Sequence, residues 1–331
     1  MRILLIGPGV SRKYGDRFYY STARRLLNGF IRNGHFVMHV SDRDLADYAL
    51  GFRALGKYYA CHRIATIAAH VRPHLVVLLL ADLITPEAIA DIRKKSRGAK
   101  VVCVELDPIG NPTVAKRFSG RLDICDGGFV TTGGDVLSEV AGSRAGFHIP
   151  NLVDIAIDDT VAYEAAPKYD VFFSGSTVKE GYQWQRALEL QAMAPGHNYC
   201  YSGIGKVGGM WGHDYIEAMG ASRVGLNLNR LEGSLYASDR MGQYLGNGML
   251  LATDRASGYD TIFDDDEMIF FASVAELAEK IARDIGPGEP WRAKARKART
   301  KALEIMSSEM VCSYIVSRVF EDRPCEGWAF K

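Results

Sequence analysis

The sequence lacks the cysteine and histidine spacing of a metal or disulfide-exchange site. Its six cysteines are scattered, and none forms a Cys-x-x-Cys pair. The eight histidines, His148 and His213 among them, show no zinc-ligand spacing. We therefore expect reduced cysteines, structural histidines and no metal site.

Several catalytic motifs are also missing. The chain contains no Gly-x-Ser-x-Gly, no P-loop and no His-Glu-x-x-His, which argues against serine hydrolases, P-loop nucleotidases and zinc proteases. Its net charge is +1, so no overall field attracts nucleic acid. These absences leave other enzyme classes open and predict no nucleic-acid partner.

No apolar run is long enough to cross a bilayer. Apart from the start of the chain, the longest run is Leu75 to Ala81, against the roughly 20 residues that a spanning helix needs. The apolar run at the start, Met1 to Ile6, ends at a glycine turn and is too short for a signal peptide. We expect a cytoplasmic protein that is peripheral to a membrane at most.

The residues that are present alternate between strand and helix patterns in both halves of the chain. Continuously apolar strands separated by helices are typical of parallel sheets covered on both faces. The fold class predicted is α/β, with two Rossmann-like doubly wound domains, one spanning 1–150 and the other 151–331. The segment from His148 to Lys168 is interpreted as the linker, and Trp291–Phe320 as one or two long helices.

The turn Gly7-Pro8-Gly9 follows the first expected strand and allows a ligand to approach the backbone. A nicotinamide-dependent oxidoreductase is therefore one alternative. It is weakened by Arg12, which stands where the third glycine of a dinucleotide motif belongs, although Asp42 lies near the end of the second strand.

Polar residues at the start of one helix of the second half form a candidate anion site. Arg240 can pair with a diphosphate through its planar fork. Gln243, one turn later, can bond ribose hydroxyls. The alternative is that Ser238 is an N-cap and that Arg240 and Gln243 are solvated.

One carboxylate stands where catalytic groups gather in parallel sheets. Asp107 ends an apolar strand and precedes Pro108. It is a candidate general base for an acceptor hydroxyl, and turn chemistry is the alternative. By contrast, the acidic run Asp264–Glu267 is interpreted as a solvated turn rather than a metal site.

The second half resembles bacterial group-1 glycosyltransferases with the GT-B fold, especially the spore-maturation branch. The stretches that carry this resemblance are Tyr169–Ser176, Val224–Arg230, Ser238–Leu251 and Phe263–Phe271, together with the Ile149-Pro150-Asn151 linker. The first half matches only in outline, at Asp107-Pro108 and from Asp123 to Thr132.

This resemblance implies a transferase that moves a sugar from a nucleotide sugar to a glycan or lipid acceptor, in a cleft between the domains and without a catalytic metal. The implied donor-binding residues are Gly175, Ser176, Gly203, Asn229, Ser238, Asp239, Arg240 and Gln243. Relatives carry Glu where Gln243 stands, and this difference is the basis of a second alternative, a sugar-binding protein without catalysis. Leu235 stands where relatives carry another glutamate, so the resemblance implies neither retention nor inversion at the anomeric carbon.

Two basic segments are candidates for contact with anionic lipid. Basic and aromatic residues are mixed from Arg12 to Arg32, and Trp291–Arg299 is strongly basic. Solvated helix faces are the alternative for both segments.

Overall fold

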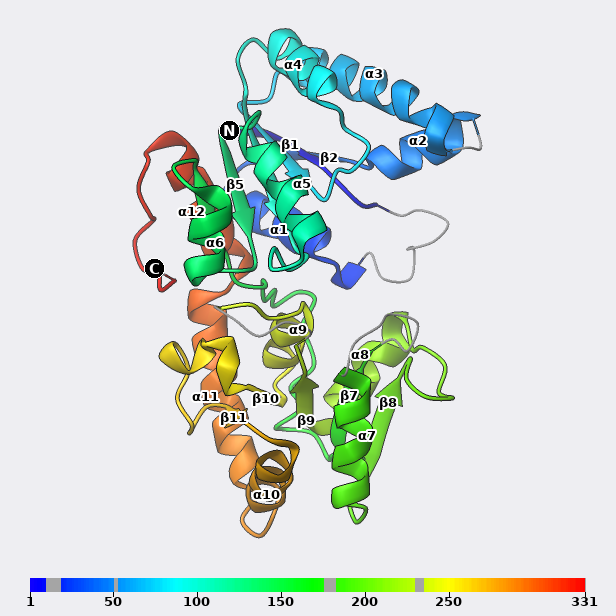
Figure 1. Ribbon diagram of the computed structural model, residues 1–331, viewed down its shortest axis with the longest axis vertical. Helices are drawn as coiled ribbons and strands as arrows, with labels where there is room; N and C mark the ends of the chain where they lie inside the picture. The colour runs from blue at the N-terminus through cyan, green and yellow to red at the C-terminus, as the bar shows by residue number, and fades with distance from the viewer. Residues whose placement is uncertain (10–18, 51–52, 176–182, 230–234, 331) are drawn as a thin grey trace. The chain divides into compact units, whose positions relative to one another are not determined.

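The computed structural model describes residues 1–9, 19–50, 53–175, 183–229 and 235–330. The chain divides into two compact units, which are described separately (Figure 1). The first unit contains residues 1–149 and 308–329, and the second contains 150–307.

The first unit is built on a six-stranded parallel sheet. The strand order is β2 (Phe36–Val40), β1 (Arg2–Ile6), β3 (Leu75–Leu79), β4 (Lys100–Glu105), β5 (Gly127–Val130) and β6 (Gly146–His148). The chain turns from β1 to β2 on one side and to β3 on the other, so the strand order reverses between β1 and β3. Ligands bind beyond the carboxyl ends of the strands at such a point in doubly wound sheets.

Side-chain caps begin four of the helices in this unit. Ser21, Ser41, Thr85 and Asn111 each accept a bond from a backbone N–H in the first turn. Proline also stands at the start of two helices, where its missing N–H costs nothing. The helices are α1 (Thr22–Arg32), α2 (Asp42–Leu50), α3 (Arg53–Val71), α4 (Pro86–Lys95), α5 (Pro112–Leu122), α6 (Gly134–Ala141) and α12 (Ser308–Phe320).

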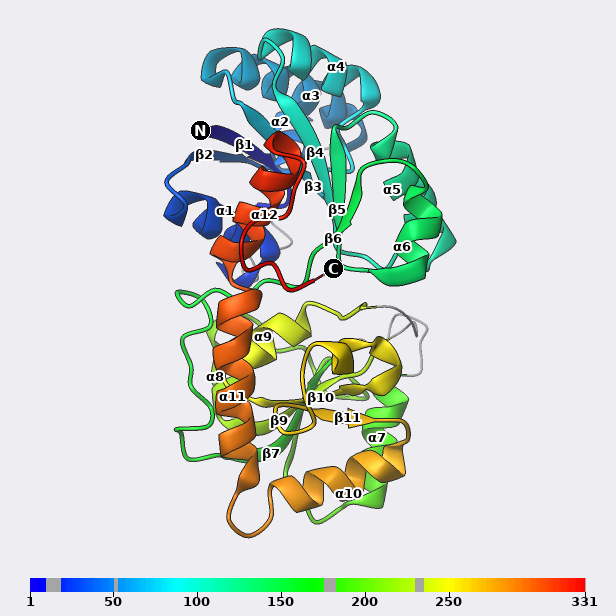
Figure 2. The same cartoon turned by 90° about the vertical axis from the view of Figure 1, so that its left-hand side faces the viewer.

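The last helix belongs to a different unit from the one predicted, since the predicted division placed all residues from 151 to 331 in the second domain. Instead α12 packs beside α1 in the first unit (Figure 2). The two helices approach closely because Gly29 of α1 has no side chain where it meets the Ser308 carbonyl and the Cys312 thiol. At Asn33, just after α1, the side-chain amide donates to the Glu309 carbonyl and to Ser313 Oγ.

We expect Gly29→Ala to lower the free energy of unfolding by about 1–3 kcal/mol, because its Cβ overpacks the contact between α1 and α12. The matched control is Gly120→Ala in α5, where an added Cβ meets nothing within 4 Å. Without that clash, alanine in place of a helical glycine should stabilise by about 0.5–1 kcal/mol. Urea unfolding measures both, and equal effects would contradict the close packing of α12 in this unit.

The second unit contains a five-stranded parallel sheet. Its order is β11 (Ile269–Phe271), β10 (Leu250–Asp254), β9 (Ser222–Asn227), β7 (Tyr169–Ser174) and β8 (Tyr199–Ser202). Here the strand order reverses between β7 and β9. The helices are α7 (Gln183–Met193), α8 (Gly212–Gly220), α9 (Arg240–Gly246), α10 (Val274–Asp284) and α11 (Pro290–Ile305), with 3-10 turns at Arg255–Ser257 and Tyr259–Thr261.

The polar segment interpreted as a linker packs onto the second unit. Asp154 and Asp158 are fully buried. The Asp158 carboxylate accepts bonds from the Asp154 N–H and from the Asn247 side chain. These acidic residues are therefore buried in the second unit and hold the segment against it, and they are not exposed to solvent.

Two doubly wound parallel sheets confirm the predicted fold class. None of the helices in the described ranges combines the length and the apolar character needed to cross a membrane.

Candidate functional site

Arg240 connects the carboxyl ends of the two strands between which the second sheet reverses. It donates from Nη1 to the Ser174 carbonyl at the end of β7 (2.6 Å) and from Nη2 to the Leu228 carbonyl just after β9 (2.9 Å). Its guanidinium also lies over the Phe173 ring, 4.9 Å from the centroid. Arginine has more N–H donors than these bonds use, so the fixed guanidinium can still bind an anion.

A buried polar network holds the start of α9 against the ends of β9 and β10. Arg240 Nε donates to Ser238 Oγ, which donates to Asn227 Oδ1 (both 2.8 Å). Asn227 Nδ2 in turn donates to Thr253 Oγ1 on β10. Ser238 is thus part of the network that places Arg240.

Two predicted glycines make room at the same edge of the sheet. Gly203, just after β8, has φ of +73°, and a Cβ there would lie 2.5 Å from the Gly175 carbonyl. Gly175, just after β7, donates its N–H to the Ser202 carbonyl. A side chain at position 203 would be strained and would push the ends of β7 and β8 apart.

Gln243 lies behind this edge and is only 6% exposed. Its Oε1 accepts from the Tyr215 hydroxyl at 2.8 Å, and its Nε2 faces Asp239 Oδ2 at 3.4 Å. The amide nitrogen suits this position because a carboxylate would face the Asp239 carboxylate. The structure therefore gives a local reason for Gln where the resemblance leads us to expect Glu.

We expect Gln243→Glu to destabilise the second unit by about 1–3 kcal/mol at neutral pH, since it buries a charge beside Asp239 and loses a donor. The exposed Gln191→Glu on α7 is the control and should change little. Chemical denaturation compares them, and an unchanged midpoint for Gln243→Glu would contradict the Asp239 contact.

The other residues predicted to bind the donor lie either near this edge of the sheet or outside the described residues. Asn229 follows β9, and its Nδ2 donates to the Tyr236 carbonyl. Asp239 is exposed at the start of α9, and Ser176 lies outside the described residues. The structure thus gathers Gly175, Gly203, Asn229, Ser238 and Arg240 around the carboxyl ends of β7, β8 and β9.

In the first unit, Asp107 lies just beyond β4, exposed and paired with Arg117, whose Nη2 donates to Asp107 Oδ2 (3.0 Å). Arg117 also binds Glu105, the last residue of β4, from Nε (2.8 Å). Burial raises the pKa of the Glu105 carboxyl above its ordinary value, while the bonds that it accepts oppose the rise. Glu105 was missed from the sequence because it is embedded in an apolar strand.

Residues 162–313 match the family described as "Glycosyl transferase-like", which covers almost all of the second unit. No curated protein matches the chain in sequence. Solved structures share its fold. HepE of Anabaena, in complex with UDP and glucose, has 12% identity and a TM-score of 0.58, with 98% of this chain and 100% of that chain covered.

Two further solved structures share this fold. AviGT4, a glycosyltransferase involved in avilamycin A biosynthesis, has 13% identity and a TM-score of 0.64, covering 96% of this chain and 97% of its own. A putative UDP-N-acetylglucosamine 2-epimerase from Listeria monocytogenes has 10% identity and a TM-score of 0.57, covering 100% and 99%. Because an epimerase shares the fold, these structures show the fold of the chain and not its activity. The second unit matches a glycosyltransferase family, and the chain as a whole shares the GT-B fold of solved glycosyltransferases.

This family match does not single out the spore-maturation branch, which stays a prediction.

The acidic run Asp264–Glu267 pairs with the basic helix α11. Lys294 donates to the Asp265 carbonyl, Lys297 to Asp266 and Lys301 to Glu267. Within the described ranges, no three His, Cys, Asp or Glu residues converge as metal ligands. Much of the positive charge of α11 is thus bound inside the second unit, which weakens its interpretation as a lipid-binding face.

Asp42 is unsuited to bind the ribose of a dinucleotide. It is fully buried, and its Oδ2 accepts from the Leu83 N–H. Burial raises its pKa. Asp42 therefore ties the segment after β2 to the segment after β3, and Arg12 lies outside the described residues.

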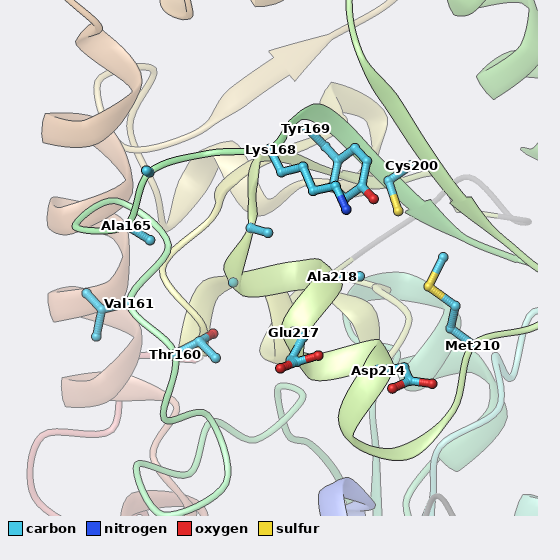
Figure 3. Close-up of a pocket in the computed structure, with 13 residues that line it drawn as sticks. Thr160, Val161, Ala165, Lys168, Tyr169, Cys200, Met210, Asp214, Glu217 and Ala218 are labelled. Carbon is cyan, nitrogen blue, oxygen red and sulfur yellow. The ribbon is translucent and has the colours of Figure 1, made fainter.

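A hollow of about 620 Å³ opens at the opposite, amino edge of the second sheet. Lys168 and Tyr169, where β7 begins, line one side, and Asp214 and Glu217 of α8 lie across from them (Figure 3). No residue predicted for the donor lines it. The hollow is thus separate from the edge that carries Arg240.

Proposed function

We propose that the chain is a glycosyltransferase that binds a nucleotide sugar in its second unit, at the carboxyl ends of β7 and β9. The observation that carries the proposal is Arg240, which is bonded to both strand ends across the point where the strand order reverses. The solved complexes of HepE with UDP and UDP-glucose support a uridine donor as the first to test.

The proposed chemistry divides between the two units. Arg240 offsets the charge of the diphosphate as it leaves, and a guanidinium held in place beforehand needs little reorganisation at that moment. Asp107 of the first unit accepts the proton of the acceptor hydroxyl. We propose a glycan or lipid acceptor of the cell envelope and no required metal, since a cation already stands beside the expected diphosphate.

Calorimetric titration with UDP-, GDP-, dTDP- and CMP-sugars tests the proposal. We expect one nucleotide class to bind, and binding by none of them would contradict it. Hydrolysis of the bound donor without acceptor distinguishes the enzyme from a non-catalytic sugar-binding protein. Fluorescence titration with NADH and NADPH tests the oxidoreductase alternative.

We propose that the protein is cytoplasmic and that its first unit contacts anionic lipid, on a surface different from the one indicated by the sequence. In the segment indicated by the sequence, Tyr20 just before α1 and Arg25 and Phe30 of α1 are buried, Tyr19 is 41% exposed, and residues 10–18 lie outside the described ranges. A larger group of exposed aromatic rings lies on α2 and α3: Tyr48, Tyr58 and Tyr59 are 69%, 75% and 46% exposed. Arg63 is exposed one turn beyond Tyr59.

We expect the protein to float with anionic vesicles at low salt and to be released at high salt, since each cation near the surface contributes about 1 kcal/mol that salt screens. Tyr58→Ser with Tyr59→Ser should reduce flotation. The control is Tyr169→Ser in the second unit. Failure of the parent to float with anionic vesicles at low salt would indicate a soluble acceptor.

A further inference from the structure

Glu105 is a buried carboxylate whose hydrogen bonds converge on the turn that carries Asp107. The residue is 5% exposed. Its Oε1 accepts from the backbone N–H groups of Leu106 and Asp107, both at 3.0 Å. Bonds from backbone N–H groups to a carboxylate are charge-assisted and fix the local chain direction.

Glu105 is also connected to the Asp107 side chain through Arg117 of α5. Arg117 Nη2 lies 2.7 Å from Glu105 Oε2 and 3.0 Å from Asp107 Oδ2, so one guanidinium group bridges the two carboxylates. Glu105 thus contacts both the backbone of Asp107 and the cation that holds its carboxylate.

The end of β5 holds the same turn from the other side. Thr131 Oγ1 donates to the Leu106 carbonyl (3.0 Å), and Thr132 Oγ1 accepts from the Ile109 N–H (3.4 Å). Residues 106–109 are therefore fixed by two strands, while the Asp107 side chain stays 58% exposed. An exposed carboxylate on a fixed turn is arranged to meet a substrate with little loss of freedom.

We propose that Glu105 is a positioning residue for glycosyl transfer, which orients the Asp107 carboxylate through the Asp107 N–H and through Arg117. This rests on the proposed function, in which Asp107 accepts the acceptor proton. Charge balance supports the role: with Glu105 present, Arg117 is shared between two carboxylates, so Asp107 is not neutralised by a cation of its own.

Glu105→Gln isolates this role because it keeps the size of the side chain. The amide has one oxygen acceptor in place of two, and its NH₂ group faces donors in Arg117 or in the backbone. Arg117 then pairs with Asp107 alone, and the turn loses one of its anchors.

The experiment is a double-mutant cycle of Glu105→Gln and Asp107→Asn, with UDP-glucose as the probe and release of UDP to water as the reaction. We expect Glu105→Gln to lower kcat about 10- to 100-fold while the Kd for UDP stays unchanged. In the Asp107→Asn background the same change should lower kcat no further, because Glu105 acts through Asp107. Glu139→Gln, exposed on α6 of the same unit, is the control.

Two results would overturn the proposal: parental kcat in Glu105→Gln, or equal losses from this change in both backgrounds, as a general structural role predicts. If Glu105→Gln unfolds, judged by circular dichroism, Arg117→Met takes its place in the cycle, since it breaks the same bridge at a half-exposed side chain. A parent chain that binds no nucleotide sugar contradicts the proposed function itself, and this result appears before any variant is made.

Discussion

Arg240→Ala should weaken the binding of the donor nucleotide by about 1.5–3 kcal/mol, the usual cost of losing a hydrogen bond to a charged group. The variant removes the guanidinium fixed by Ser174, Leu228 and Ser238, and with it the cation at the reversal point of the second sheet. Titration of UDP by calorimetry, against parent and variant, measures the loss. The uridine moiety itself should still bind, so uridine affinity should change less than UDP affinity.

The chain offers a matched control in Arg255. That arginine also lies over a phenylalanine ring, Phe270, at 5.4 Å, but its guanidinium binds the Asp260 and Asp265 carboxylates instead of strand ends. Arg255→Ala should leave UDP affinity within experimental error. Equal UDP affinity in Arg240→Ala and in the parent would remove Arg240 from the donor site.

Asp107→Asn should lower kcat for glycosyl transfer by about 10²–10⁴-fold, the typical contribution of a positioned general base. Asparagine has nearly the same shape and can still accept a bond from Arg117, but it cannot take up the proton. The Kd for UDP should not change, because the donor residues belong to the second unit. Steady-state assay of UDP release measures kcat.

Asp123→Asn is the control for this change. Asp123 is 62% exposed and pairs with Arg144 at 2.8 Å in the same unit, so it reproduces the exposure and the ion pair of Asp107 without its place after β4. Its kcat should equal that of the parent. A kcat in Asp107→Asn as high as in Asp123→Asn would show that the base lies elsewhere.

The sequence was most informative where burial alone determines the structure. The apolar runs Met1 to Ile6 and Leu75 to Ala81 contain β1 (Arg2–Ile6) and β3 (Leu75–Leu79), and the stretch Trp291–Phe320 forms α11 and α12. Continuous apolar runs and a regular helical stripe are local signals, so one sequence is enough to find them. Both sheets, and therefore the fold class, follow from these elements.

Long-range packing was less predictable. The destination of α12 depends on the fit of Gly29 against Ser308, a contact between residues far apart in the chain. The role of Asp264–Glu267 depends likewise on Lys294, Lys297 and Lys301, which reach the acidic run only in the folded unit. Composition shows the charges but not which of them meet.

Only part of the candidate site could be predicted from the sequence, because several of its contacts join elements that are far apart in the chain. Arg240 follows from its place at the start of a helix, which is a local feature, and Gly203 follows from the resemblance to glycosyltransferases. The burial of Gln243 against Tyr215 and the bridge from Glu105 to Asp107 depend on neighbours from other elements. Glu105 was hidden because a single carboxylate in an apolar strand carries no spacing signal.

A crystal structure of the protein with UDP bound tests the central claim most directly. The account predicts the diphosphate beside the Arg240 guanidinium, at the carboxyl ends of β7 and β9, with Gly175 and Gly203 at the same edge. UDP bound in the hollow lined by Lys168 and Glu217, at the amino edge of the same sheet, or bound only in the first unit, would contradict it.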